Sequence, residues 1–374
     1  MDVFDILGRL VAFPSVAGEP NGAIAGWIGA HLGKWGARVT ALPGPEGDRS
    51  NLFATIGPAN VPGYILSGHM DVVPAAESQW TSPPFALRRE GDRLYGRGST
   101  DMKGFLAAAL AATPQLSRLR LARPIHFAFS YDEEVGCSGA PHLIARLPEL
   151  CAKPLGVIVG EPSGMRAVRG HKGKAAARVT INGRSGHSSR PDLGRNAIHA
   201  MADVLTATVD EAARLTRGPL DPAFEPAYSS LGAGVITGGL SVNIIPDACA
   251  MELEARALPG VDPASLLAPV KARAEAWAVK DYRVEWTPLS AYPGLSLRQD
   301  AALAALLHEL TGEAPLAAVS YGTEAGLYQA AGFDAIICGP GDIARAHKPD
   351  EYILASELTG CQQLIEALGA RCAA

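Results

Sequence analysis

Histidine and acidic residues follow predicted strands in the first half of the chain. The apolar run 64–66 predicts a buried strand, and His69 and Asp71 come after it two positions apart, so their side chains share one face. Asp101 follows a second short extended run and two glycines. A histidine, a nearby aspartate and a later aspartate at a strand end are typical of a metal ligand, its hydrogen-bonding partner and a further ligand. This stretch therefore predicts a metal site.

Further acids follow the next strands of the same pattern. Residues 125–131 and 155–159 predict two more strands, and each ends in glutamate. A second histidine lies in a loop near the C-terminus, after a Gly-Pro-Gly turn. The candidate site residues are His69, Asp71, Asp101, Glu133, Glu134, Glu161 and His347.

The composition of this set favours two metal ions over one. Imidazole and carboxylate ligands without cysteine suit Zn²⁺, and also Mn²⁺ or Co²⁺. Carboxylates gathered in one apolar pocket repel one another, so cations are needed to keep them ionised. Two ions about 3.5–4 Å apart polarise a carbonyl group and lower the pKa of bound water, and one carboxylate must stay free to take the proton. Adjacent Glu133 and Glu134 could divide these tasks. The set therefore predicts hydrolysis of an acyl or amide bond.

The elements that would position these residues form two patterns. Residues 1–172 and 292–374 alternate strands and helices, which predicts an α/β fold with a mixed, mostly parallel sheet sandwiched by helices. Sites in such sheets form outside the carboxyl ends of the strands, where the candidate acids fall. Residues 173–291 have the order β-α-β-β-α-β, a ferredoxin-like arrangement. We therefore predict a catalytic metal-binding domain, 1–172 and 292–374, with an inserted domain, 173–291.

The composition gives no support to several other classes of protein. A length of 374 residues, 48% hydrophobic and 19% charged, is typical of a globular protein with two domains. The net charge of −5 and the lack of a lysine–arginine run argue against nucleic-acid binding. No apolar stretch approaches the ~20 residues of a membrane helix, and the N-terminus resembles an amphipathic helix more than a signal peptide. The six cysteines contain no CxxC pair, which predicts reduced thiols in a cytoplasmic protein.

Four sequence blocks resemble the dinuclear zinc metallopeptidase family. They are GHMDVVP at 68–74, LYGRGSTDMKG at 94–104, SYDEEVG at 130–136 and GEP at 160–162. That family contains acetylornithine deacetylase, succinyl-diaminopimelate desuccinylase, aminoacylase and the glutamate carboxypeptidases. The resemblance runs over nearly the whole chain and includes the inserted domain, so it implies a zinc exopeptidase-like catalytic domain with a lid.

The resemblance implies a metal-binding role for five residues. His69, Asp101 and Glu161 would bind one zinc ion. Asp101, Glu134 and His347 would bind the other, so that Asp101 would bridge the two ions. The resemblance also implies a cis peptide bond after Asp101.

The resemblance assigns the catalytic roles to three other residues. Glu133 would be the general base and would return the proton to the leaving amine. Asp71 would orient His69. His187, in the inserted domain, would reach the active site of a second subunit and stabilise the oxyanion, which implies a homodimer formed through that lid domain.

Three residues would bind the substrate if the resemblance holds in detail. Asn243 and Arg256 match the pair that holds the substrate carboxylate, and arginine suits this task because its fork binds a carboxylate through two hydrogen bonds. Residues 321–325 lack the motif of the desuccinylases. The carboxylate of Glu324 in this stretch would suit a substrate with an extra amino group, as ornithine has.

We therefore expect a cytoplasmic amidohydrolase that acts on a small N-acyl amino acid with two divalent ions, zinc above all. Within the family, further stretches are most similar to the acetylornithine deacetylases, which implies removal of the acetyl group from N2-acetyl-L-ornithine in arginine biosynthesis. Two alternatives stay open. One is another N-acyl amino acid hydrolase, of desuccinylase, aminoacylase or dipeptidase type. The other is a non-catalytic metal-binding protein, which the presence of Glu133 disfavours because a pure metal site needs no unligated carboxylate.

Overall fold

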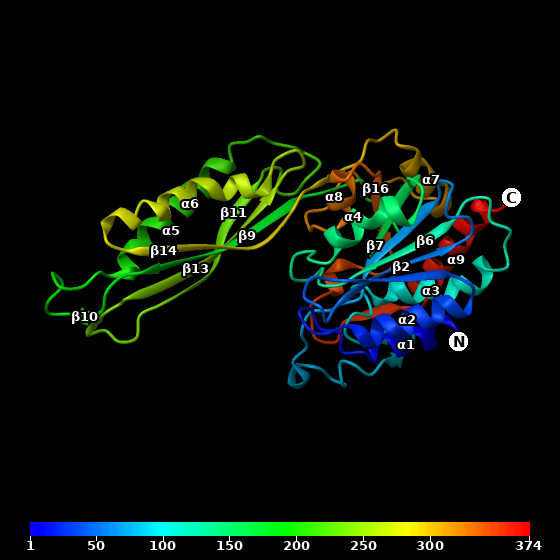
Figure 1. The fold of residues 1–374 in the computed structure, drawn as a ribbon, viewed down its shortest axis with the longest axis horizontal. Coiled ribbons are helices and arrows are strands. Elements are labelled where there is room, and N and C mark those ends of the chain that lie inside the picture. Colours follow the sequence, from blue (N-terminus) through cyan, green and yellow to red (C-terminus); the bar gives the residue numbers. More distant parts are fainter. The chain divides into compact units, whose positions relative to one another are not determined.

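The computed structural model describes residues 1–374, which form two compact units (Figure 1). Unit 1 comprises Met1–Gly170, Leu295–Ala317 and Thr323–Ala374, and unit 2 comprises His171–Gly294 and Ala318–Gly322. The division differs from the predicted domains chiefly in the segment Ala318–Gly322, which we expected in the catalytic domain. This segment belongs to unit 2 because Val319 forms a β-bridge with His171 and the Ser320 hydroxyl donates to the Glu225 carbonyl.

Unit 1 is built on a six-stranded sheet. In spatial order its strands are β1 (Arg38–Pro43), β2 (Ser50–Ile56), β6 (Ile125–Ser130), β3 (Tyr64–His69), β7 (Gly156–Pro162) and β16 (Ala335–Gly339). The four strands from β6 to β16 run parallel, whereas β1 pairs antiparallel with β2 and β2 with β6. This mixed, mostly parallel sheet confirms the predicted α/β fold class.

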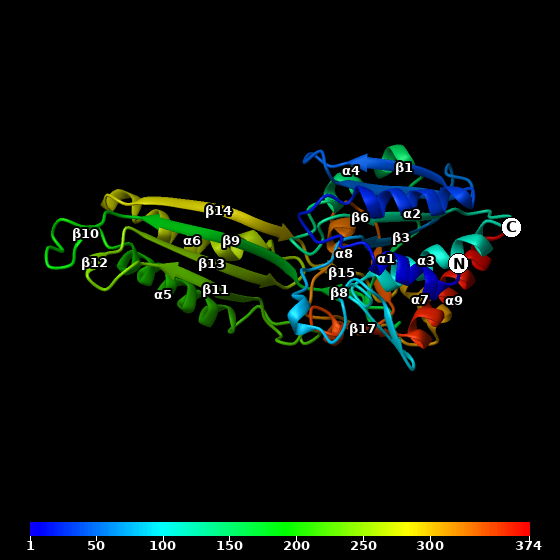
Figure 2. The same ribbon diagram turned by 90° about the horizontal axis from the view of Figure 1, so that it is seen from below.

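Helices cover both faces of this sheet (Figures 1 and 2). One face carries α1 (Val3–Val11), α2 (Gly22–Lys34), α3 (Lys103–Leu116), α7 (Ala302–Thr311) and α9 (Ala355–Cys372), and the other carries α4 (Ala140–Leu150) and α8 (Ala325–Ala330). The helix α3 is buried along most of its length, between the sheet and α1 and α9. An added Cβ at Gly160 of β7 would lie 2.0 Å from the Phe105 ring of α3, so glycine is what allows this close approach.

The fold brings the candidate acids to one edge of the sheet. His69 is the last residue of β3, and Glu161 is the penultimate residue of β7, before Pro162. Glu133 and Glu134 follow β6, which pairs in parallel with β3. Because the three strands are neighbours and run in the same direction, their carboxyl ends meet.

A separate three-stranded sheet lies beside this edge in unit 1. Its order is β17 (Tyr352–Leu354), β5 (Arg93–Tyr95) and β4 (Arg88–Glu90), all antiparallel. The strand β5 directly precedes the segment that leads to Asp101, and β17 follows the segment that contains His347. This small sheet therefore joins the two segments. Two-residue strands, β8 (Gly170–His171) and β15 (Leu295–Ser296), lie where the chain passes between the units.

Unit 2 has the predicted β-α-β-β-α-β order. Its elements are β9 (Gly173–Asn182), α5 (Ala197–Leu215), β11 (Ser230–Gly238), β13 (Ala248–Ala257), α6 (Ala268–Glu275) and β14 (Arg283–Tyr292). The strands form an antiparallel sheet in the order β11-β13-β9-β14, with both helices packed on one face, which is the ferredoxin-like arrangement (Figure 1). A short two-stranded antiparallel sheet, β10 (Gly186–His187) with β12 (Ile244–Ile245), lies at one end.

Two further findings bear on the sequence analysis. None of the helices combines the length and the apolar character that crossing a membrane requires. All six cysteines are free thiols.

Two glycines of α9 test how tightly α3 and α9 pack. An added Cβ at Gly369 would lie 2.1 Å from Cδ2 of the buried Leu116 in α3, whereas one at Gly360 would meet nothing within 4 Å. We expect Gly369→Ala to lower the free energy of unfolding by about 1–2 kcal/mol through overpacking. The matched control, Gly360→Ala, is expected to raise it by about 0.5–1 kcal/mol because alanine favours the helix. Chemical denaturation measures both, and changes of the same sign would contradict this packing.

Candidate metal centre

His69 is buried and directs one ring nitrogen at the acids. Its Nδ1 lies 2.9 Å from the backbone oxygen of Asp71, which can only accept a hydrogen bond, so Nδ1 carries a proton. Its Nε2 lies 3.0 Å from Oδ1 of Asp101 and 3.8 Å from Oε1 of Glu161. This tautomer leaves Nε2 free to bind a cation.

Asp101 lies between two histidines. Its Oδ1 faces His69, and its Oδ2 lies 3.3 Å from Nε2 of His347. The same Nε2 lies 3.0 Å from Oε2 of Glu134. A carboxylate whose two oxygens face different ligand groups has the geometry of a bridging ligand. The peptide bond between Asp101 and Met102 is cis, as the resemblance implied.

Asp71 contacts the backbone of both glutamates as well as His69, whereas we expected it to contact His69 alone. Its Oδ1 accepts the backbone N–H of Glu133 and its Oδ2 accepts that of Glu134, both at 3.1 Å. The same carboxylate lies 3.6 Å from Nδ1 of His69. One buried side chain therefore fixes the start of the loop after β6 as well as the imidazole, and it sets the direction of two neighbouring glutamates.

The ligand atoms fall into two groups. One joins His69, Glu133 and Glu161, and the other joins His69, Asp101 and Glu134, with the ligand atoms of each group within 4.8 Å of one another. Glu133 thus lies among possible ligands, and its Oε1 also accepts a hydrogen bond from the Cys137 thiol at 3.3 Å. Position alone does not distinguish Glu133 from Glu134 as the base, so the assignment of Glu133 rests on the family resemblance.

The pKa values show that this cluster attracts positive charge. Burial raises the pKa of Glu133 to about 8. Burial, followed by repulsion from Asp101, also raises the pKa values of Glu134 and Glu161. Hydrogen bonds to Asp101 and Glu134 raise the pKa of His347 to about 10. Without a cation the cluster therefore takes up protons, and its oxygen and imidazole donors fit divalent ions such as zinc, cobalt or manganese.

His187 and Asn243 lie together at one end of unit 2. His187 is in β10, and its Nδ1 lies 2.8 Å from the hydroxyl of Ser189. The backbone oxygen of Asn243 accepts the N–H of Ser188 at 3.1 Å. The side-chain oxygen of Asn243 accepts a hydrogen bond from the Ser241 hydroxyl at 2.7 Å. These two predicted site residues are thus neighbours, on two segments that are far apart in the sequence.

Arg256 lies at the opposite end of the same unit. It is the penultimate residue of β13, and its Nε donates to Oε1 of Glu254 at 2.6 Å. From Ala248 to Arg256 the strand spans roughly 25 Å, at about 3.3 Å per residue. The unit therefore separates Arg256 from Asn243, although we expected the two residues to hold one carboxylate together.

Glu324 has internal partners. It is 1% exposed, and its two carboxylate oxygens accept hydrogen bonds from the hydroxyls of Ser67 at 2.6 Å and Ser130 at 2.7 Å. The hydroxyl of Tyr328 lies 2.8 Å from that of Ser67. These contacts join the start of α8 to the ends of β3 and β6. They brace β3, which ends in His69, and β6, which precedes Glu133, and the contact of Glu324 with a substrate stays a prediction.

Residues 65–370 match the family described as peptidase family M20/M25/M40. The chain belongs to this family. The acetylornithine deacetylase of Proteus mirabilis is 34% identical over 364 residues, which cover 93% of this chain and 91% of that protein. The acetylornithine deacetylase of Yersinia pseudotuberculosis is 33% identical over 382 residues, which cover 97% of this chain and 96% of that protein. The predicted resemblance is thereby confirmed, and the chain is a metal-dependent hydrolase.

Solved structures of M20 proteins share the fold. An M20 metallo-carboxypeptidase from Sulfolobus solfataricus superimposes with a TM-score of 0.81 at 20% identity, over 99% of each chain. A dinuclear metal-binding M20 peptidase from Bacillus subtilis superimposes with a TM-score of 0.68 at 16% identity, over 99% of this chain and 97% of that one. At these identities the comparison supports the architecture.

Sequence reasoning missed two buried charges beside the M20 metal centre. Glu351 and Arg97 are 1% and 4% exposed, and Nη1 of Arg97 lies 2.7 Å from Oε2 of Glu351. The only available signal was that each charge stands inside a block with a site residue: Arg97 is close to Asp101, and Glu351 is close to His347. Their separation of 254 positions hides the pairing from any local pattern.

Binding of divalent ions to this M20 hydrolase is expected to release protons. Glu133 and His347, with pKa values of about 8 and 10 in the metal-free chain, hold protons at pH 7 that a cation must displace. Affinity for Zn²⁺ should therefore rise as the pH is raised from 6 to 8. Calorimetric titration of chelator-treated protein in buffers of different ionisation enthalpy should show about one or more protons released per chain.

Two variants serve as controls for this measurement. Glu133→Gln removes one titrating group and should lower the number of protons released. Glu90→Gln alters an exposed carboxylate outside the site and should leave that number unchanged. Zinc binding with no proton release in the unmodified chain would contradict the electrostatic account.

Proposed function

We propose that this chain removes the acetyl group from N2-acetyl-L-ornithine and gives L-ornithine and acetate, as a cytoplasmic step of arginine biosynthesis. The observation that carries the proposal is similarity to acetylornithine deacetylases over more than nine-tenths of the chain. The cluster of acids and histidines at the carboxyl ends of β3, β6 and β7 supplies the groups that hydrolysis of an amide requires.

The acids and histidines divide into metal ligands and groups that move protons. We assign His69, Asp101 and Glu161 to one ion, and Asp101, Glu134 and His347 to the other. When bound there, two divalent ions, zinc above all, supply Lewis-acid chemistry that polarises the amide carbonyl and makes a water molecule more acidic. The two-sided contacts of Asp101 support its assignment as the shared ligand.

Glu133 carries the proton in this proposal. Its carboxylate takes a proton from the attacking water and delivers it to the amine nitrogen as the C–N bond breaks. The hydrogen bond from its backbone N–H to Asp71 fixes the main chain of Glu133 at the start of the loop. This restricts the positions that its carboxylate can occupy. His187 would donate to the oxyanion that forms on the former carbonyl oxygen.

The positions of the proposed substrate-binding residues in unit 2 support the proposal of a homodimer. His187 and Asn243 are separated from Arg256 by the length of β13, so a ligand of amino-acid size cannot touch both places on one copy of the unit. If all three residues bind one substrate, the β10–β12 sheet with His187 must come from a second subunit. An assembly of two copies satisfies this requirement at both sites.

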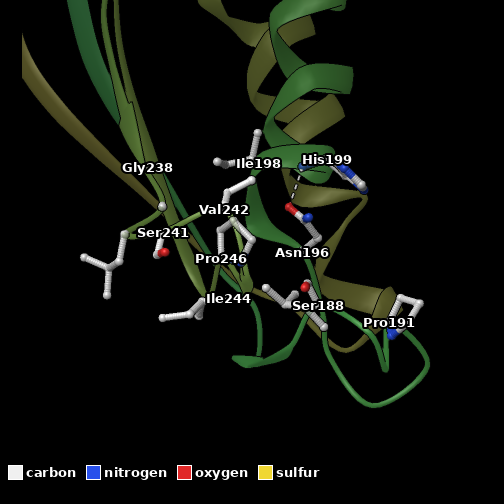
Figure 3. A pocket seen from close by; sticks show the side chains of 13 residues that line it. Ser188, Pro191, Asn196, Ile198, His199, Gly238, Ser241, Val242, Ile244 and Pro246 are labelled. Carbon is white, nitrogen blue, oxygen red and sulfur yellow. Dashed lines mark hydrogen bonds between the residues drawn. The ribbon is translucent and has the colours of Figure 1, made fainter.

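Exposed apolar side chains on unit 2 suit such an assembly. Val235 and Ile236 are about half exposed on β11, which is an edge strand of its sheet. Leu240 and Val242, in the turn after it, are 88% and 99% exposed. Beside this turn lies an open cavity of about 630 Å³, in which Figure 3 shows Val242 near the start of α5. Large exposed apolar side chains gathered on one strand and the turn after it are typical of an interface.

Amine release from four substrates tests the proposed activity. The panel is N2-acetyl-L-ornithine, N-succinyl-diaminopimelate, N-acetyl-methionine and a simple dipeptide, each with the zinc-loaded and the chelator-treated protein. We expect N2-acetyl-L-ornithine to give the highest kcat/KM and chelation to abolish turnover. Preference for another substrate would keep the hydrolytic chemistry and overturn the assignment of the substrate.

Mixing two inactive variants tests the second-subunit role of His187. Glu133→Gln is expected to lower kcat by about 10²–10⁴-fold while it retains its metal ions, because it removes the base and keeps the shape. His187→Ala is expected to be impaired through loss of the oxyanion contact. After subunit exchange, the mixture should recover about a quarter of the original activity, since half of the dimers are mixed and each contains one intact site.

Two measurements make this mixing experiment decisive. Subunit exchange is verified by mass spectrometry of differently labelled chains. No recovery of activity in a verified mixture would show that His187 acts within its own subunit or not at all.

A further inference from the structure

One buried carboxylate holds the segment that presents Asp101. Oε1 of Glu351 accepts the backbone N–H groups of Thr100 at 2.9 Å and Asp101 at 3.1 Å. Oε2 of Glu351 accepts the backbone N–H of Gly98 at 3.0 Å and Nη1 of Arg97 at 2.7 Å. Both oxygens are thus used by donors from residues 97–101, and one of these donors is the peptide N–H of the bridging candidate itself.

The backbone around Glu351 extends this attachment. Its own carbonyl accepts the N–H of Gly96 at 3.0 Å, and the carbonyl of Tyr352 accepts the hydroxyl of Thr100 at 2.6 Å. Immediately beyond, β17 pairs with β5 in register from Tyr352 opposite Tyr95. The antiparallel pairing therefore aligns the two segments, and the Glu351 carboxylate closes the loop that follows.

Arg97 connects a third segment to this carboxylate. Its Nη2 lies 3.4 Å from the carbonyl oxygen of Pro74, three residues after Asp71, and its guanidinium lies 5.1 Å from the centre of the Trp80 ring. The side chain of Arg97 is 4% exposed, so its charge is balanced inside the protein by Glu351. The pair therefore joins the segments that follow His69 and that precede Asp101.

The segment that contains His347 leads directly to Glu351. His347 lies four residues before Glu351, and its side chain is 50% exposed, so little packing holds the imidazole itself. Asp350 accepts hydrogen bonds from the backbone N–H and the hydroxyl of Thr81, at 3.0 and 2.9 Å. Residues 350 and 351 thus anchor this segment to the two that carry Asp71 and Asp101.

We propose that Glu351, together with Arg97, is a positioning residue that sets Asp101 and His347 relative to each other before an ion binds. This inference rests on the proposed assignment of Asp101 and His347 as metal ligands. A ligand set that is already ordered binds more tightly because the ion does not have to order the loops. Residues that hold metal ligands from behind affect metal affinity for the same reason.

Glu351→Gln tests the proposal. Glutamine has nearly the same shape, but its amide nitrogen donates hydrogen bonds, so two N–H donors of residues 97–101 would lose their acceptor and Arg97 would lose its balancing charge. We expect affinity for at least one divalent ion to fall by about 10–100-fold. The measurement is competition with a chromophoric chelator on purified, folded protein, and the Co²⁺ absorption spectrum should change as well.

Glu357→Gln is the matched control. Glu357 also pairs with an arginine, since its Oε2 lies 2.8 Å from Nη1 of Arg345, and it accepts a backbone N–H, that of Leu354 at 2.9 Å. It has no hydrogen bond to residues 96–101. We expect Glu357→Gln to bind metal as the unmodified chain does. Unchanged affinity in folded Glu351→Gln, or an equal loss in both variants, would overturn the proposal.

Two further variants keep the outcomes separate. His347→Ala in the same assay tests the ligand assignment, because unchanged affinity there would remove the basis of the inference. Loss in His347→Ala without loss in Glu351→Gln would overturn the positioning role alone. If Glu351→Gln does not fold, Arg97→Lys, which keeps the charge but loses the planar fork, is expected to weaken metal binding, and unchanged binding would overturn the proposal.

Discussion

Repulsion among buried carboxylates is the constraint on which the rest of this structure depends. Asp101, Glu133, Glu134 and Glu161 lie close to one histidine; Asp101 and Glu161 are buried, and Glu133 and Glu134 are partly buried. Two like charges 4 Å apart repel by about 4 kcal/mol at an effective dielectric constant of about 20. The raised pKa values of the glutamates express this repulsion together with burial. A cluster of this kind is stable only with protons or cations, which is why we expect metal binding to displace protons.

The fold supplies the rigidity that such a cluster needs. Parallel strands β6, β3 and β7 bring the acids to one edge, and the close contact of Gly160 with Phe105 holds the sheet against α3. Other side chains position the ligands by accepting hydrogen bonds from backbone N–H groups, as Asp71 does for both glutamates. Glu324, which accepts from two serine hydroxyls, braces the ends of β3 and β6. Each of these acids is satisfied by hydrogen-bond donors, so none adds free negative charge to the cluster without compensation.

The sequence predicted what depends on local pattern and missed what depends on distant pairing. Strands that end in acids, the order of elements in unit 2 and the α/β class followed from periodicity and residue type. The partners of Asp71 were hidden because backbone N–H groups have no signature in a sequence. The pair of Arg97 and Glu351 was hidden by its separation along the chain. Glu324 was assigned to substrate contact from its motif, whereas its hydroxyl partners stand on strands far away in sequence. The roles of His187, Asn243 and Arg256 are proposals, because they depend on contacts with a substrate and with a second subunit.

The order of residues along the chain has a consequence for biosynthesis. Asp101, Glu133, Glu134 and Glu161 all precede unit 2, whereas His347 and Glu351 are near the C-terminus. At about 5–20 residues per second, a ribosome needs about 10–40 s to pass from Glu161 to Glu351. During this time the nascent chain has most of its acids but neither the second histidine nor the edge strand β16. Complete loading with metal therefore requires synthesis of nearly the whole chain. A chain truncated within unit 2 contains the acidic residues but lacks His347 and Glu351.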